Sequence, residues 1–258
     1  SLPKATTPLT EGVTPDGKSL NVTAITATVA QYGDYITQSD VLELTSIDNT
    51  IVEATKILGR QAGLTLDTVT RNVLQSGTNV TYCPKSDGSE VTSRSGLDAT
   101  CQLTVKVVQQ VVAKLKGQNA PTINGKYVGI IHPYVAYSLM RDPEWIDAHK
   151  YAQPDNLFTG EIGEIAGVRF VETTEAKVYA GGVFGTLIMG ANAYGVTEIT
   201  GGGLQTIIKQ KGSAGTADPL DQRSSIGWKA IKTAELLIPN YLVRVESKVA
   251  DFADTAAN

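Results

Sequence analysis

The sequence predicts an elongated α+β protein with few of the residues that catalysis needs. Three observations lead to this prediction: a strand-rich arm over residues 1–40, one unusually long amphipathic helix, and a series of short apolar strands in the second half of the chain. The chain has 258 residues, of which 41% are apolar. It is therefore long enough to fill a core, and this composition excludes a disordered chain.

The N-terminal arm has little of its own to pack against. Pro15-Asp16-Gly17 is a turn signal, and residues 22–29 after it are β-branched and alternate weakly between apolar residues and Thr, which predicts a strand. A lone two-stranded hairpin of such small side chains is marginal in water. We therefore expect the arm to lie on another surface, most simply that of a neighbouring copy. This points to assembly before it points to chemistry.

The same arm contains a P-loop pattern, in which Gly12 is followed after four residues by Gly17, Lys18 and Ser19. A phosphate loop needs a buried strand before it and a helix directly after it, because the first N–H groups of that helix bind the phosphate. The flanking residues predict neither element. We interpret the match as false and expect a hairpin tip with Asp16 and Lys18 in solvent. A nucleotide-binding protein is the alternative.

Charge and hydropathy exclude several classes of partner. The formal net charge is −4, and no window holds a run of like charges, so we expect no strong binding to nucleic acid or to an anionic membrane. No stretch of eighteen apolar residues occurs, so no segment is expected to span a membrane. The sequence starts at Ser1 without an apolar signal region, and we expect a further segment to precede it.

The two cysteines, Cys83 and Cys101, flank a polar loop over residues 84–100. Two free thiols in a reducing cytoplasm are the favoured interpretation, and a disulfide across the base of the loop is the alternative. No histidine lies near them in the sequence, so they do not predict a zinc site.

The strongest helix signal runs from about residue 48 to residue 76. Apolar residues recur there every three or four positions, and Gly77 is placed to end the helix. At 1.5 Å per residue, this helix is about 40 Å long, which suits the spine of an elongated molecule. Gly59 and Gly63 inside it are expected to allow a bend or the close approach of another backbone.

The rest of the chain predicts shorter elements. A second helix is expected from the cap residue Thr104 to Gly117, and a third is expected to open at Pro133. Residues 151–167 are expected to form a loop. Strands are predicted over residues 127–131, 168–171, 186–189, 204–209, 226–237 and 241–246.

Side chains suited to catalysis are sparse. His132 ends a predicted buried strand and is interpreted as a structural residue, and His149 lies in a segment expected to pack or to form an interface. No serine lies in a Gly-x-Ser-x-Gly elbow, and calcium-loop, dinucleotide and Cys-x-x-Cys motifs are missing. Four glutamates are candidate paired carboxylates, although their spacing is that of a solvated rim: Glu161, Glu164, Glu172 and Glu175. We predict no catalytic residue, cofactor or metal.

Several blocks of sequence occur in an order that covers nearly the whole chain. They are residues 9–18 (LTEGVTPDGK), 29–35 (VAQYGDY), 62–67 (AGLTLD), 131–133 (IHP), 145–151 (WIDAHKY), 160–163 (GEIG), 167–173 (GVRFVET), 190–196 (GANAYGV) and 215–223 (GTADPLDQR). Together they resemble the major capsid proteins of tailed bacteriophages, in the branch with the Hong Kong 97-like coat fold. The chain departs from that family in its long, polar loop 78–100 and in not including the arm that usually precedes the first block.

The resemblance implies an architecture of four parts. Residues 1–40 are expected to form an extended β-hairpin loop over an adjacent subunit, and residues 41–119 the spine helix and peripheral domain. Residues 120–200 are expected to form the axial domain, which meets its neighbours around five-fold and six-fold positions. Residues 201–258 are expected to return to the peripheral domain and to supply the C-terminal strands.

The resemblance also implies a function and partners. It implies a structural coat protein that forms hexameric and pentameric capsomers of an icosahedral shell, which encloses double-stranded DNA and binds it weakly. Scaffold, portal and decoration proteins are further possible partners, and no membrane is expected. The protein would belong to the virion and be assembled in the bacterial host cytoplasm. The alternatives are a cellular nanocompartment shell of the same fold and a secreted β-rich adhesin, which the two long helical stripes disfavour.

Overall fold

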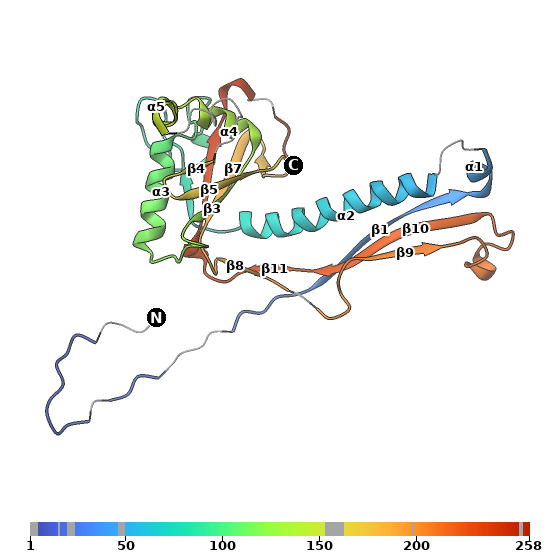
Figure 1. Cartoon of the computed structure of the whole chain (residues 1–258), viewed down its shortest axis with the longest axis horizontal. Helices are drawn as coiled ribbons and strands as arrows, with labels where there is room; N and C mark the ends of the chain where they lie inside the picture. The colour runs from blue at the N-terminus through green and yellow to red at the C-terminus, as the bar shows by residue number, and fades with distance from the viewer. Residues whose placement is uncertain are drawn as a thin grey trace.

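The computed structural model describes residues 5–14, 16–19, 24–45, 50–152, 163–197, 199–252 and 255–258. Figure 1 shows a compact body at one end, a long helix that runs away from it along a narrow sheet, and an N-terminal segment that extends in another direction. The helices are α1 (Asp40–Thr45), α2 (Thr50–Gln75), α3 (Val105–Gly117), α4 (Pro133–Met140) and α5 (Pro143–Ala152). The strands are β1 (Ala30–Ser39), β2 (Val80–Tyr82), β3 (Tyr127–Ile131), β4 (Glu164–Ile165), β5 (Val168–Glu172), β6 (Val178–Tyr179), β7 (Val183–Met189), β8 (Tyr194–Val196), β9 (Gln205–Lys209), β10 (Arg223–Lys232), β11 (Ala234–Leu236) and β12 (Leu242–Lys248).

The compact body is built on a seven-stranded mixed sheet. Six of its strands follow the order β2-β12-β7-β3-β5-β4, and the seventh, β6, pairs with β7. The pairs β12–β2 and β3–β5 are parallel and the others are antiparallel. The central strand β7 is buried at all seven positions. Burial of successive residues means that both faces of the sheet are covered at this strand.

Helix α3 packs its apolar face into the largest core of the body, as its sequence predicts. Val108, Val111 and Leu115 are almost fully buried, and the Thr104 hydroxyl accepts a hydrogen bond from the N–H of Val107 at the start of the helix. The predicted helix at Pro133 is confirmed as α4. The predicted strands at residues 127–131, 168–171 and 186–189 are confirmed as β3, β5 and β7.

Helix α2 lies along a separate sheet with the order β1-β10-β9, and we call this helix and its sheet the elongated unit. Leu58 and Ala62 of α2 pack against Ile226, Trp228 and Ala230 of β10. The 26 residues of α2 confirm the predicted spine helix almost to its ends. No other part of the described chain approaches Gly59 or Gly63, because a Cβ atom at either position would meet nothing within 4 Å.

The strand predicted over residues 22–29 is wrong for the part that the structure describes. Residues 24–29 form no strand, and β1 begins at Ala30 instead. The reason is pairing: Ala30 lies opposite Lys232 at the end of β10, and no partner strand extends further. A turn does occur in the arm, between Thr10 and Val13, where the Val13 N–H donates to the Thr10 carbonyl. The predicted turn at residues 15–17 includes Pro15, which lies outside the described residues.

Two other predictions need correction. The predicted loop 151–167 is shorter, because α5 extends to Ala152 and β4 begins at Glu164; residues 153–162 lie outside the described residues. The segment predicted as one strand over residues 226–237 is two strands, β10 and β11, and they pair with different partners. Strand β12 lies inside the sheet of the compact body. Sheet membership therefore divides residues 201–258 between the two parts of the molecule.

Candidate assembly surfaces and the joint between them

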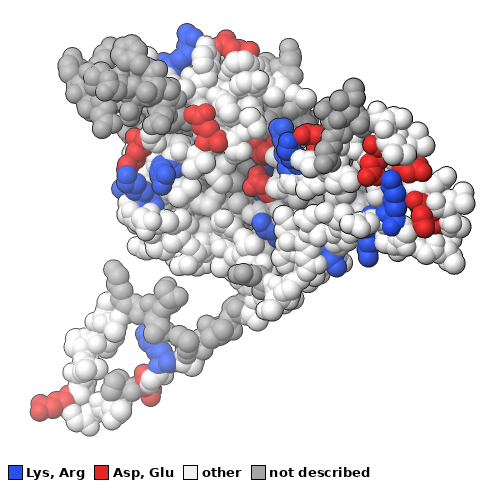
Figure 2. All heavy atoms as spheres, turned by 45° about the vertical axis from the view of Figure 1, so that its right-hand side comes forward, with Lys and Arg blue, Asp and Glu red and all other residues white. Residues whose placement is uncertain are grey.

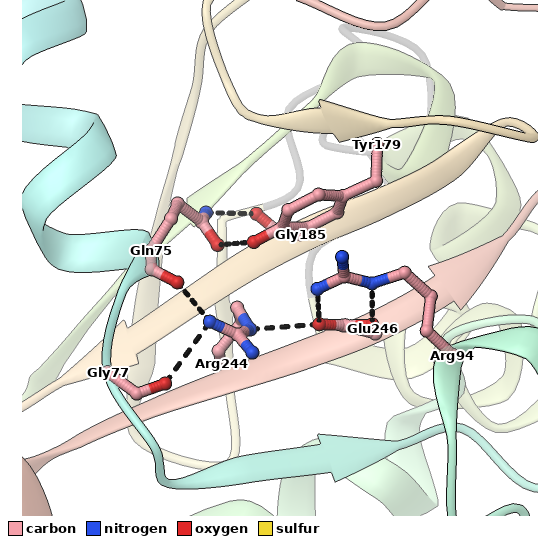
Figure 3. A network of polar contacts seen from close by, with 7 residues as sticks. All are labelled: Gln75, Gly77, Arg94, Tyr179, Gly185, Arg244 and Glu246. Carbon is pink, nitrogen blue, oxygen red and sulfur yellow. Dashed lines mark hydrogen bonds and ion pairs between the residues drawn. The ribbon is translucent and has the colours of Figure 1, made fainter.

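The compact body and the elongated unit meet at a network of polar side chains, which we call the joint. Its members come from the end of α2, the loop after β2, and strands β6, β7 and β12: Gln75, Gly77, Arg94, Tyr179, Gly185, Arg244 and Glu246 (Figure 3). Segments far apart in the sequence converge here, so the joint fixes how the long helix leaves the body.

Glu246 is the centre of the joint and is fully buried. Its two carboxylate oxygens accept hydrogen bonds from Arg94 Nε at 2.7 Å and Arg94 Nη2 at 2.6 Å, and one of them also accepts from Arg244 Nε at 2.9 Å. The Tyr179 ring lies 3.5 Å from Arg94 Cζ, in the geometry of a cation–π contact. Hydrogen bonding to Glu246 raises the pKa of Arg94, and burial raises the pKa of Tyr179.

Arg244 connects this charge cluster to the C-terminal end of α2. Its Nη1 atom donates to the carbonyl of Gln75 and, at 3.1 Å, to the carbonyl of Gly77. The last carbonyls of a helix have no partner within the helix and carry partial negative charge, so a cation there is favourable. The Gln75 side chain donates to the Gly185 carbonyl at 2.8 Å and accepts from the Tyr179 hydroxyl at 3.0 Å. The helix end is therefore held on three strands of the body.

The elongated unit has one sheet face that α2 does not cover. Strand β9 is exposed at all five positions, and β1 at eight of ten. Large apolar side chains remain in solvent there, including Tyr35 and Ile207. A sheet face with exposed apolar side chains is typical of a surface that another chain covers.

The N-terminal segment, residues 5–29, is also uncovered. Apart from Ala27, its described side chains are exposed, with Leu9, Val13 and Ile25 among the large apolar ones. Figure 2 shows part of this segment standing clear of the body, with acidic and basic side chains along it. A segment of this kind gains little free energy from its own chain.

The P-loop residues lie in this segment. Gly12 belongs to the Thr10–Val13 turn with φ +79°, and Gly17, Lys18 and Ser19 are exposed in a stretch without helix or strand. Residues 20–23 lie outside the described chain, and residues 24–29 are not helical. Our interpretation of the pattern as a false match stays a prediction.

His132 has a structural position in the described chain. Its Nδ1 atom accepts a hydrogen bond from the Tyr134 N–H at 3.2 Å, so it caps the start of α4. The imidazole centroid lies 5.0 Å from that of Phe184, and burial lowers the pKa of His132. The side chain of His149 lies outside the described residues.

The four candidate glutamates do not form a described carboxylate pair. Glu164 is paired with Lys126, Glu175 lies 3.8 Å from Arg71 Nη1, Glu172 is exposed at the end of β5, and Glu161 lies outside the described residues. No group of three or more His, Cys, Asp or Glu side chains suited to a metal occurs in the described part of the chain.

The cysteines are both free and buried, which agrees with the favoured interpretation of free thiols. Burial raises the pKa of both thiols. None of the helices in the described ranges is long and apolar enough to cross a membrane.

One local pattern in β12 points to the joint. Arg244 and Glu246 lie two residues apart in a strand whose other central residues are apolar, and alternation places both on the same face. A charged pair inside a buried strand needs a partner. The partner, Arg94, lies 152 residues away, so no local pattern identifies it.

Comparison with known proteins decides the family. The model of the family described as phage capsid protein matches residues 25–217, three quarters of the chain. The chain belongs to this family of phage capsid proteins. It is a structural coat protein, and the resemblance found in the sequence blocks is confirmed. No match is found among the curated proteins.

Solved capsids share the fold. The capsid of cyanophage P-SCSP1u matches with a TM-score of 0.74 at 12% identity, over 95% of this chain and 81% of that chain. The capsid of cyanophage Pam1 matches with a TM-score of 0.66 at 14% identity, over 87% and 76%. An encapsulin of Synechococcus elongatus matches with a TM-score of 0.56 at 8% identity, over 89% and 78%. The Hong Kong 97-like fold is thereby confirmed.

Proposed function

We propose that this coat protein assembles into hexameric and pentameric capsomers of an icosahedral shell around double-stranded DNA, by overlap of the N-terminal segment and contacts between exposed edges. The observation that carries the proposal is the pairing of two uncovered surfaces in one chain: an extended segment and an open sheet face. Each leaves apolar side chains in water, and neighbouring copies would cover both.

In this proposal the elongated unit acts as the peripheral domain and the compact body as the axial domain. The body completes its own core, so it serves as a rigid block that meets equivalent blocks around the axes. The elongated unit, with one open sheet face, serves as the part that neighbouring subunits overlap. The joint sets the angle between the two.

We propose that the shell encloses the DNA and binds it only weakly. The net charge of −4 supports this, since tight attraction to phosphate needs clustered cations that release counterions. A coat that held DNA tightly would also hinder its entry and exit. Scaffold, portal and decoration proteins are proposed as partners, and the proposed place of the protein is the virion, after assembly in the host cytoplasm. No enzymatic activity is part of the proposal.

The test is removal of the N-terminal segment. The purified chain is expected to give closed shells or regular five- and six-membered capsomers by negative-stain electron microscopy, with a matching mass by light scattering. A variant without residues 8–29 is expected to remain a folded, soluble subunit that forms no shells. This deletion ends before Ala30, so β1 keeps its pairing with β10.

A matched control replaces residues 8–29 with a Gly/Ser linker of the same length. It keeps the chain length but removes the side chains, and it is expected to fail in assembly as the deletion does. Normal shells from the deletion variant would contradict overlap by this segment.

A nanocompartment shell of the same fold is the second candidate, and the encapsulin match is the observation that favours it. The two candidates differ in their content. Particles taken from the natural producer are expected to hold DNA that resists nuclease until the shell is opened. Particles that hold protein cargo and no DNA would support the nanocompartment instead.

A further inference from the structure

The open face of the elongated unit has a regular pattern of side chains. Ile226, Trp228 and Ala230 of β10 face α2, so the alternate residues of β10 point to the opposite face. The register of the sheet then places residues of β1, β10 and β9 side by side in three rows. These rows are Gly33, Lys229 and Gln205; Tyr35, Gly227 and Ile207; and Thr37, Ser225 and Lys209.

The middle row forms a hollow with a glycine floor. Gly227 lies between Tyr35 and Ile207, both of which are exposed apolar side chains. A Cβ atom on Gly227 would lie 2.8 Å from Tyr35 Cβ, and one on Gly33 would lie 2.6 Å from the Trp228 carbonyl oxygen. The cavity measures about 330 Å³ and is lined by Tyr35, Ile207, Gly227 and their neighbours. It is large enough for one or two aliphatic side chains.

Two lysines lie beside the hollow, in the neighbouring rows of the sheet, while Asp34 is among the residues that line the hollow itself. The three strands carry four cations and one carboxylate, and Lys229 and Lys209 stand in the rows on either side of Gly227. The one carboxylate, Asp34, accepts a hydrogen bond from Gln61 Nε2 of α2 at 2.6 Å, so it is directed to the other face. The open face therefore fits an occupant with an apolar side chain and an adjacent carboxylate.

The N-terminal segment offers this combination at its turn. The turn between Thr10 and Val13 places Glu11 at its corner, where Gly12 has φ +79°, and Leu9 and Val13 flank it. Leu9 is 79% exposed and Val13 is 64% exposed, so both are free to enter a pocket. In its own chain this segment extends away from the β1-β10-β9 sheet (Figure 1). A second copy is the occupant that the geometry allows.

We propose that the turn formed by residues 9–13 of one subunit occupies the glycine-floored hollow of a neighbouring subunit. Leu9 and Val13 lie against Tyr35 and Ile207, and Glu11 pairs with Lys229 or Lys209 beside the hollow. This proposal rests on the proposed function and adds the place where the overlapping segment binds. We call this contact, between residues 9–13 of one subunit and the hollow of its neighbour, the seat. The apolar contact supplies the affinity and the charges select the register.

Cross-linking in assembled particles tests the seat. The double variant Val13→Cys, Ile207→Cys is oxidised and run on a non-reducing gel. Covalent multimers are expected, because the two thiols come from different subunits and lie together at the seat. The native thiols, Cys83 and Cys101, are buried and do not compete.

A matched control pairs Val13→Cys with Ile57→Cys. Ile57 is also an exposed aliphatic residue of the elongated unit, but it lies on α2, away from the open sheet face. We expect at least tenfold less multimer from this pair. Particles in which both pairs cross-link equally, or in which the Val13–Ile207 pair does not cross-link, would overturn the seat and leave the proposed function intact. Failure of the unaltered chain to form particles would instead overturn the proposed function and the seat with it.

Charge reversal tests the contact between Glu11 and the two lysines beside the hollow. Glu11→Lys and Lys229→Glu are each expected to lower the cross-linked fraction several-fold, and the two together are expected to restore it. If neither this double variant nor the matching Glu11→Lys, Lys209→Glu variant restores the cross-linked fraction, the proposed contact between Glu11 and these lysines is contradicted. Particles that form and cross-link normally with Lys229→Glu but retain less DNA would show that this face binds nucleic acid instead.

Discussion

Strands β7 and β9 show how differently the two parts of the molecule are completed. Both strands carry large apolar residues, yet β7 is buried at every position and β9, with its two isoleucines, is exposed at every position. The central strand of the compact body finds its covering on both faces within the chain. The elongated unit receives covering on one face only, from α2. The difference teaches that the single chain covers the central strand of one part, whereas it leaves an edge strand of the other part open to whatever binds there.

The largest effect is expected at the joint, where the two parts meet. Glu246→Ala removes the buried carboxylate shared by Arg244, which is largely buried, and Arg94, whose side chain is 39% exposed. Removing one partner of a buried ion pair lowers the free energy of unfolding by about 3–5 kcal/mol. Urea unfolding of the dissociated subunit measures this loss.

The control for Glu246→Ala is Glu53→Ala on the exposed side of α2. Glu53 forms an ion pair with Lys56 at 2.7 Å, but both side chains are more than half exposed. Solvent screens such a pair, so the expected change is below about 0.5 kcal/mol. Equal effects at the two sites would mean that the joint does not hold the two parts together.

The next effect is expected inside the elongated unit. Trp228 is 5% exposed, packs between the sheet and α2, and donates from Nε1 to Gln61 Oε1 at 3.3 Å. Trp228→Ala is expected to lower the free energy of unfolding by about 3 kcal/mol, because a large cavity forms under the helix. Thermal unfolding by circular dichroism measures it.

Ile208→Ala, in the neighbouring strand of the same sheet, is the matched control. Ile208 is 55% exposed in the single chain, and little apolar area is lost when it is shortened. We expect less than about 1 kcal/mol in the dissociated subunit. A loss as large as that of Trp228→Ala would show that the single chain already covers this strand.

A smaller effect is expected at Asp142, which caps two helices of the body. Its carboxylate accepts hydrogen bonds from the N–H of Val105 in α3 at 2.8 Å and from the N–H of Glu144 in α5 at 3.0 Å. Asp142→Ala is expected to lower the free energy of unfolding by about 1–2 kcal/mol. Asp142→Asn keeps an acceptor and is expected to lose less, as chemical denaturation of the two variants will show.

The smallest effect concerns pH. Burial lowers the pKa of His132 in the folded state, so the unfolded chain binds the proton more readily. The contribution of His132 to stability is therefore complete above its unfolded pKa of about 6.5 and is lost as the pH falls through the lower, folded value. His132→Asn keeps an acceptor for the Tyr134 N–H and is expected to flatten the stability profile below pH 6.5. An unchanged profile would show that another group titrates there.

The sequence predicts the parts of this fold that depend on local patterns. The spine helix follows from apolar spacing, and the helix from Thr104 follows from its cap, because both signals lie within a few residues of their effect. For the described residues 24–29, the predicted strand failed because a strand needs a partner, and β10 ends opposite Ala30. Helix α5 was missed although Asp142-Pro143 is a helix-start signal.

The joint and the hollow, in contrast, depend on residues that lie far apart in the sequence. Arg94 and Glu246 meet across 152 residues, and Gly33 and Gly227 become neighbours of the same hollow only through the register of β1 with β10. Neither follows from composition or periodicity. The family was predicted from the resemblance of short sequence blocks, and the family match over residues 25–217 confirms it.

The way in which Arg244 holds the end of α2 has a mechanical consequence. The helix is fixed at its C-terminal end and extends about 39 Å to Thr50, so it acts as a lever with its pivot at the joint. A rotation of about 5° at that pivot moves the far end by about 3 Å over this length. In the proposed shell, we therefore expect that small differences in side-chain geometry at Arg94 and Arg244 would let the same subunit meet neighbours on flatter and on more sharply curved regions.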